Sequence, residues 1–374
     1  MRMPDKYFPQ SAAESMKRKN VFRQFVSPGL FDENQQRASL TACGDPLVVL
    51  NKLIDWEIFR PQLVLLFKKR PDVKTLGRKP LDPVMMFKVL ILQRLYHLSD
   101  DQAEFQIRDR ASFQRFLGFY AASGSPDAKT IWLFRERLHE ENIAGEVFLL
   151  FDKVLDDHGM FARNGQMIDA SFVEMPRQRN TREENQKIKA GEVPQEWEQQ
   201  PNKLAQKDVD ARWAKKNDEN HYGYKNHINA DTQSKLIRSY LVTSASVHDS
   251  QVFDQLLLPK SEGKTVYADS AYRSAAFDDF LRKALFVNRI IRKAQKNKPL
   301  TEQQKSWNHR WSKTRSRVEH IFGAMFQVTR GGAHLLYIGQ KRVTTAIGLA
   351  NFVYNIQRSI QILRGQSRVS AVPS

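Results

Sequence analysis

The chain has 374 residues, enough for two domains or for one large domain with an insertion. Its formal charge of +18 indicates a polyanionic partner. Its single cysteine, Cys43, excludes an internal disulfide and a thiolate metal site, and favours a reducing cytoplasm. No segment reads as a signal peptide or as an apolar run long enough to span a bilayer, so we expect no membrane insertion.

The first part of the chain reads as a basic arm followed by helices. Residues 1–37 are polar and basic without periodicity, which predicts a flexible arm. Residues 38–155 have a helical pattern and predict a helical N-terminal domain that would bind DNA ends or mediate oligomerisation. Four local signals mark helix starts or ends, namely Asp82-Pro83, the capping box Ser99-Asp100-Asp101-Gln102, Gly118, and Ser125-Pro126-Asp127.

Charge leaves two interpretations of these helices open. Six basic and seven acidic residues lie between Asp100 and Glu140, a net charge of −1. That balance is poor for a helix that reads DNA. A plain helical bundle and a helix-turn-helix therefore both remain possible.

After Asn164-Gly165 the pattern changes to alternating strands and helices. Residues 156–365 predict a mixed α/β sheet with flanking helices, and 366–374 a flexible tail. The polar segment 177–220 predicts an insertion, partly helical near Asp208 to Lys216. The predicted strands are Gln166 to Val173, His221 to Ala230, Leu236 to Thr243, Thr265 to Ala268 and Phe286 to Ile291. The predicted helices are Asp249 to Leu258, Phe277 to Leu285 and Ser312 to Gln327.

Three carboxylates stand in informative settings. Asp169 and Asp269 each end a short apolar, β-favouring run, and Glu319 lies in a helical pattern. The segment from Arg282 to Arg330 around Glu319 has 13 basic and two acidic residues, a net charge of +11. A carboxylate at the end of a core strand is costly unless it is paired or holds a cation.

Oxygen ligands of this kind suit Mg²⁺ or Mn²⁺ on a phosphate substrate. The three carboxylates predict two ions per site, with Asp169 bridging both, Asp269 holding one and Glu319 the other. Taken alone, each aspartate would instead be a helix cap or loop residue, and Asp269 could cap the next helix.

Several nearby residues are candidates for DNA contact. Arg315 lies one helical turn before Glu319 and could tether that carboxylate or contact the cut phosphate, and both interpretations stay open. Lys225 could contact a phosphate or be an ordinary exposed strand lysine. Packing is favoured for Trp307 and Trp311 over stacking on an unpaired base. The remaining DNA-binding candidates are Arg310, Lys313 and Arg317.

The segments Tyr267 to Tyr272, Arg315 to Glu319 and Asn351 to Asn355 resemble the DDE transposases of bacterial insertion sequences, in the branch named after insertion sequence five. The resemblance implies a ribonuclease-H-like core and a catalytic triad of Asp169, Asp269 and Glu319. It implies cleavage at the element's terminal inverted repeats and joining of the 3′-hydroxyl ends to target DNA. It also implies a bacterial, nucleoid-associated protein.

The match to the family signature is incomplete. The signature places a tyrosine three residues before the arginine and a lysine seven residues after the glutamate, where this chain has Ser312 and Phe326. Only Arg315 and Glu319 carry over, so another basic residue is a candidate for the lysine's role.

The expected partners are double-stranded DNA, both element ends and target, and a second copy of the chain in a dimer. A structure-specific nuclease or resolvase on the same fold and a DNA-binding repressor derived from a transposase are the competing hypotheses. Strand transfer separates all three.

Overall fold

The computed structural model describes residues 38–39, 41–67, 79–119, 124–216, 218–294, 299–328 and 337–370. The predicted arm, 1–37, lies outside these residues. The chain divides into two compact units, Met1–Gly44 and Asp45–Ser374, and the second contains every element discussed below. None of the described helices combines the length and apolarity needed to cross a bilayer.

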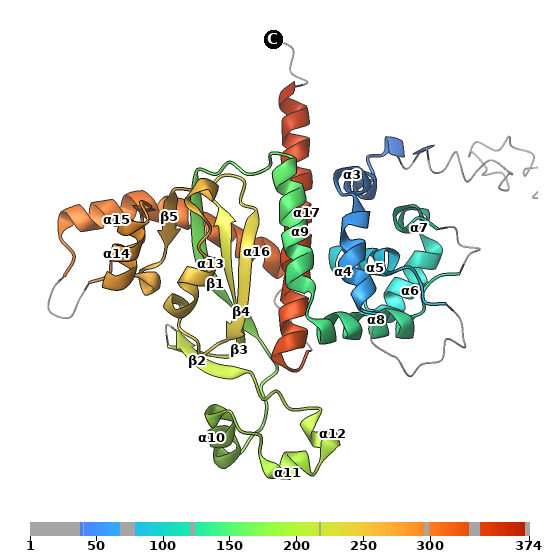
Figure 1. The fold of residues 1–374 in the computed structure, drawn as a ribbon, viewed down its shortest axis with the longest axis horizontal. Coiled ribbons are helices and arrows are strands. Elements are labelled where there is room, and N and C mark those ends of the chain that lie inside the picture. The colour runs from blue at the N-terminus through green and yellow to red at the C-terminus, as the bar shows by residue number, and fades with distance from the viewer. Residues whose placement is uncertain are drawn as a thin grey trace, which may run out of the picture. The chain divides into compact units, whose positions relative to one another are not determined.

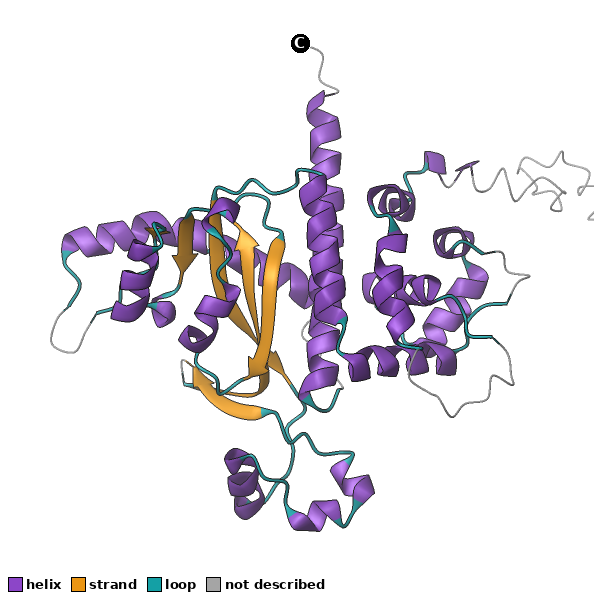
Figure 2. Cartoon of the chain, viewed as in Figure 1, coloured by secondary structure: helices purple, strands orange, loops and turns teal. Residues whose placement is uncertain are grey.

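Helices account for the regular structure of the described residues from Pro46 to Asp157 (Figure 2). They are α3 Pro46–Leu53, the 3₁₀ helix η2 Trp56–Phe59, α4 Arg60–Leu65, α5 Pro83–Tyr96, α6 Asp100–Asp109, α7 Ala111–Leu117, α8 Ala128–Glu141 and α9 Ala144–Asp157. The local signals of the sequence are confirmed. The Asp82 side chain caps α5, Ser99 forms a capping box on α6, and Asp127 caps α8. Gly118 ends α7 with φ 81°, a left-handed conformation that favours glycine.

A six-stranded mixed sheet follows (Figure 1). Its strands are β1 Gly165–Glu174, β2 Arg212–Lys216, β3 Glu219–Asp231, β4 Ile237–Ser244, β5 Thr265–Ala268 and β6 Val287–Asn288. The order is β2-β3-β1-β5-β6, and β4 pairs with β3. β3 is antiparallel to β1, β2 and β4, whereas β5 is parallel to β1 and β6.

The insertion 177–220 differs from the prediction. Its helices are α10 Arg182–Ala190, α11 Gln195–Glu198 and α12 Pro201–Leu204, and Trp197 is fully buried among them. The predicted helical stretch near Asp208 to Lys216 is wrong, because Arg212 to Lys216 form strand β2. Pairing with β3 decides the conformation there. Asp208 accepts a hydrogen bond from the Tyr224 hydroxyl at 2.8 Å, which ties the insertion to the sheet.

Other predicted boundaries also shift. The predicted helix Ser312 to Gln327 is two helices, α15 Glu302–Arg315 and α16 Arg317–Val328. The predicted helix Asp249 to Leu258 is a 3₁₀ turn, η4 Asp249–Val252, followed by the short α13 Phe253–Leu256. Helix α14 spans Ala275–Lys283, and the predicted strand Phe286 to Ile291 contracts to β6. Helix α17, Gln340–Ser370, continues through residues 366–370, so that part of the predicted flexible tail is helical.

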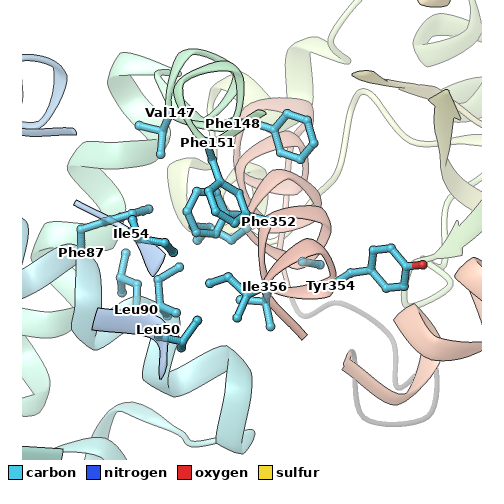
Figure 3. Packing of buried hydrophobic residues seen from close by; sticks show 14 of the residues in the cluster. Leu50, Ile54, Phe87, Leu90, Val147, Phe148, Phe151, Phe352, Tyr354 and Ile356 are labelled. Carbon is cyan, nitrogen blue, oxygen red and sulfur yellow. The ribbon is translucent and has the colours of Figure 1, made fainter. Parts of the chain in front are cut away.

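Helix α17 is where the N-terminal helices and the sheet share one hydrophobic core. It contacts α5, α8 and α9 as well as β4 (Figure 1). The ring of Phe352 stacks on Phe151 at a centroid distance of 4.3 Å and meets the edge of Phe87 at 5.6 Å (Figure 3). Met167 and Ile228 bring the sheet into the same cluster. Burying a side chain of this size is worth roughly 1.5 to 3 kcal/mol.

Polar side chains of α17 set its position on the sheet. Asn351 accepts a hydrogen bond from the Asn226 amide of β3 at 2.9 Å. Asn355 accepts one from the Ile237 N–H at 2.8 Å and donates one to the Ile237 carbonyl at 2.7 Å. Because these side chains are fully buried, each unmade bond would be costly. The Asn351 to Asn355 motif therefore holds α17 on strands β3 and β4.

A buried histidine near this core predicts an acid-sensitive fold. His139 of α8 is 2% exposed, and neither ring nitrogen has a hydrogen-bond partner in the described part of the chain. Burial lowers the pKa of His139 to about 4, although the neighbouring Glu136 acts to raise it. The ordinary histidine pKa is about 6.5, so the unfolded chain binds a proton first as the pH falls. The stability contributed by neutral His139 is present above about pH 6.5 and is lost towards pH 4.

We expect the free energy of unfolding of the wild type to fall by up to about 3 kcal/mol more than that of His139→Leu across this range. Urea denaturation at a series of pH values measures the difference. His309→Leu, which removes an exposed histidine of α15, should keep the wild-type profile. Identical profiles for wild type and His139→Leu would show that His139 does not govern the acid response.

Candidate active site

The β1–β5 register brings two predicted site residues together. The two strands are parallel, and Ile168 lies opposite Ala268. Asp169 is the next residue of β1 and Asp269 directly follows the end of β5, so we infer that they are neighbours, because paired strands lie about 4.8 Å apart. Asp169 does not end its strand as the sequence suggested, because β1 continues to Glu174 with β3 as its partner.

Asp169 is a largely buried carboxylate. Its side chain is 15% exposed. Oδ1 accepts the Ala170 N–H at 2.8 Å and Oδ2 accepts a bond from Arg315 at 3.2 Å. Burial raises the pKa of Asp169 to about 6; the Ala170 and Arg315 contacts act to lower it, whereas the charge of Asp269 adds to the rise. The ionised form of Asp169 therefore benefits from a nearby cation.

Asp269 caps the turn that follows it, one of the roles that the sequence allowed. Its Oδ1 accepts the Ser270 N–H at 2.7 Å at the start of the 3₁₀ turn η6, Ser270–Tyr272, and its negative charge acts to raise the pKa of Asp169. The Tyr272 hydroxyl is buried without a hydrogen-bond partner in the described residues. Burial raises the pKa of Tyr272, and the negative charges of Asp249, Asp169 and Asp269 raise it further.

Arg315 connects Glu319 to the aspartates. It is the last residue of α15, and Glu319 lies in the first turn of α16, beyond the break at Ser316. One guanidinium nitrogen of Arg315 donates to Asp169 at 3.2 Å and the other to Glu319 at 3.1 Å. The predicted tether to Glu319 is thus present, and it extends to Asp169. The Glu319 side chain is 64% exposed.

The donor chemistry of the site fits a hard cation. Carboxylate oxygens are the ligands that Mg²⁺ and Mn²⁺ prefer. Within the described residues, no three acidic, histidine or cysteine side chains lie close enough together to form a ready-made metal site. Arg315 instead supplies the positive charge between Asp169 and Glu319.

Lys225 of β3 has partners within the fold. Its side chain is buried, and Nζ donates to Asp249 at 2.8 Å and to the Val247 carbonyl at 2.8 Å. The alternative of an exposed strand lysine is therefore wrong, because Val247 and Asp249 of the segment after β4 contact the Lys225 side chain. His248 caps η4, and Asp249 forms the ion pair with Lys225.

The other basic candidates lie on the surface. Arg310, Lys313 and Arg317 are exposed, and Arg317 also donates to the Thr232 carbonyl at 3.1 Å. Sequence reasoning missed Lys216, the last residue of β2, whose positive charge lowers the pKa of Asp169. The polar segment Arg212 to Lys216 has no strong strand signal of its own and becomes a strand by pairing with β3, which sequence reasoning did not predict.

Removing the Arg315 guanidinium should destabilise the protein. Arg315→Ala leaves Asp169 without its cation, at a cost of about 1 to 3 kcal/mol in the free energy of unfolding. Lys305→Ala is the matched control on the same helix, because its ion pair with Glu302 is exposed and worth at most about 0.5 kcal/mol. Urea denaturation near neutral pH measures both, and equal small losses would mean that Arg315 does not stabilise Asp169.

Comparisons with known proteins indicate the family of the chain. The family model described as a transposase DDE domain matches residues 161–356, and a second model described as a transposase domain matches residues 34–137. The transposase for insertion sequence element IS1106 of Neisseria meningitidis serogroup B is 30% identical over 243 residues, which are 64% of this chain and 79% of that protein.

A solved structure also aligns with the chain. The cryo-EM structure of the piggyBac transposase synaptic complex with hairpin DNA covers 88% of this chain and 77% of its own, with a TM-score of 0.44 and 13% identity. The family match alone spans more than half of the residues. The chain therefore belongs to the DDE-domain transposases of bacterial insertion sequences, enzymes that cleave DNA and transfer its strands.

Proposed function

We propose that this transposase cleaves phosphodiester bonds at the terminal inverted repeats of its element and joins the freed 3′-hydroxyl ends to target DNA. Asp169, Asp269 and Glu319 are the proposed catalytic residues. The observation that carries the proposal is the β1–β5 register, which makes two aspartates neighbours, together with Arg315, which links Glu319 to one of them.

The arrangement of the strands supports a ribonuclease-H-like catalytic domain over residues 156–365. Leaving out the edge strand β2, the order is β4-β3-β1-β5-β6, with β3 antiparallel to β1 and both β5 and β6 parallel to it. Residues 38–155 would form the helical domain that precedes it. The segments Tyr267 to Tyr272, Arg315 to Glu319 and Asn351 to Asn355 further support placement in the insertion-sequence-five branch.

We propose two Mg²⁺ or Mn²⁺ ions as cofactors, held by Asp169, Asp269 and Glu319. When bound, they would activate the attacking oxygen and stabilise the leaving one. Asp169 suits this role because it is a buried carboxylate that lacks full charge compensation. Glu319 suits it because its side chain is exposed and can reorient.

The protein's own residues would position the DNA. Arg310, Lys313 and Arg317 present positive charge on α15 and α16, the two helices that also carry Arg315 and Glu319. Basic side chains at such positions hold the phosphate backbone of either strand without reading sequence. A dimer would bring two element ends together, and the basic surface would accept target DNA beside them.

The first test removes one carboxylate charge. Asp269→Asn should abolish cleavage of DNA that carries the element end while leaving the fold and DNA affinity intact, because the amide oxygen can still cap Ser270. Asp254→Asn, an exposed aspartate of α13, should retain wild-type cleavage. Thermal melting and a binding titration accompany the cleavage assay. Full cleavage by Asp269→Asn would remove Asp269 from the catalytic set.

The second test asks whether the enzyme joins DNA. Purified protein with Mg²⁺ or Mn²⁺ and a pre-cut end of its own element should join that end covalently to an unrelated plasmid. Glu319→Gln should give no joined product, whereas Glu196→Gln, which changes an exposed glutamate of α11, should behave as wild type. Cutting without joining would favour the nuclease or resolvase, and sequence-specific binding without either reaction would favour the repressor.

A further inference from the structure

A cleft beside α15 has the composition of a binding site for an unpaired base. It encloses about 580 Å³, within the size range of small-ligand sites. Two tryptophans and two arginines line it, together with Glu302 and the polar residues around it. The four are Trp307, Trp311, Arg289 and Arg310.

The two indole rings have different roles. Trp311 packs against Tyr267 of β5 at a centroid distance of 6.1 Å, so it holds α15 on the sheet. Its ring N–H is buried with no hydrogen-bond partner among the described residues. Trp307 meets Trp311 edge to face at 6.5 Å. The Trp307 ring contacts Trp311 and Arg292, and neither is a residue of the sheet.

Arginines surround the rings without neutralising partners. The guanidinium carbons of Arg289 and Arg310 lie 4.4 and 5.0 Å from the Trp311 centroid. Arg292 lies 4.7 Å from the Trp307 centroid and lines a separate cleft. In the part of the chain that the structure describes, none of these three arginines forms an ion pair with a carboxylate.

The cleft adjoins the proposed catalytic residues along two elements. Trp311 precedes Arg315 by four residues on α15, about 6 Å along the helix axis. Tyr267, which Trp311 contacts, precedes Asp269 by two residues on the extended chain of β5, where alternate side chains share a face.

We propose that this cleft binds an unpaired nucleobase of the DNA strand that enters the active site, with the base stacked on Trp307 and its flanking phosphates held by Arg289 and Arg310. Aromatic rings stack on any base, and guanidinium groups pair with phosphate. A base inside a duplex has both faces covered by its neighbours and cannot enter. The inference rests on the proposed function, because it assumes that DNA reaches Asp169 and Asp269.

The test compares two DNA ligands without divalent metal. One is a blunt duplex and the other is the same duplex with a short unpaired extension. The extension should lower the wild-type Kd about tenfold. Trp307→Ala should lose this gain and keep its Kd for the blunt duplex, whereas Trp307→Phe should retain most of the gain. Trp132→Ala, which removes an exposed tryptophan of α8, should behave as wild type.

Photocross-linking of the wild-type protein tests the contact without any substitution. A 5-bromouracil placed in the extension should link to the peptide that contains Trp307, as located by mass spectrometry. The inference is overturned by adducts confined to other peptides, by a wild type that does not distinguish the two ligands, or by a Trp307→Ala variant that weakens both equally. Because cleavage is not involved, loss of the extension effect leaves the proposed function standing. Failure to bind either DNA would contradict both.

Discussion

Two aspartates on adjacent parallel strands, one of them largely buried, set the conditions that the rest of this site must meet. The pairing of Ile168 with Ala268 makes Asp169 and Asp269 neighbours, and like charges at this separation disfavour ionisation of both. Burial adds to that cost at Asp169. Arg315, at the end of α15, offsets part of this cost because its guanidinium donates hydrogen bonds to both Asp169 and Glu319. A stable core around the pair is needed because electrostatics alone would push it apart.

Ile168 and Ala268, the apolar neighbours of the pair, belong to one hydrophobic cluster, and a second cluster, which includes Met167 of β1, is built around α17. The apolar face of α17 supplies Phe352 to the N-terminal helices, and its buried asparagines bind β3 and β4. β3 pairs along most of β1, so α17, by holding β3, also helps to fix the position of the strand that carries Asp169. The motif from Asn351 to Asn355 thus acts by holding α17 on the sheet.

Local signals predicted what depends on local chemistry. The caps at Asp82, Ser99 and Asp127, the five principal strands and the apolar runs before the two aspartates all follow from residues within one turn or one strand. Contacts between residues far apart in the sequence cannot be predicted from such local signals. The Asp169–Arg315 contact joins residues 146 positions apart, and no periodicity reports it.

The same limit explains the errors. Alternation placed Lys225 on a strand correctly, but its burial depends on the segment that follows β4 and supplies Asp249. The segment from Arg212 to Lys216 is polar and has no strong strand signal of its own, and it becomes strand β2 through pairing with β3. The single helix predicted around Glu319 is divided at Ser316, where a turn interrupts an otherwise continuous helical pattern.

The shared core has a mechanical consequence. Phe59 and Phe87 from the first helices and Phe151 from α9 all meet Phe352, whose helix also carries the asparagines bound to the sheet. A force applied to the N-terminal helices is therefore carried through a close-packed, weakly compressible interior to β1. These helices are thus coupled to the strand that carries Asp169, and severing the chain near residue 156 would expose the aromatic faces on both fragments.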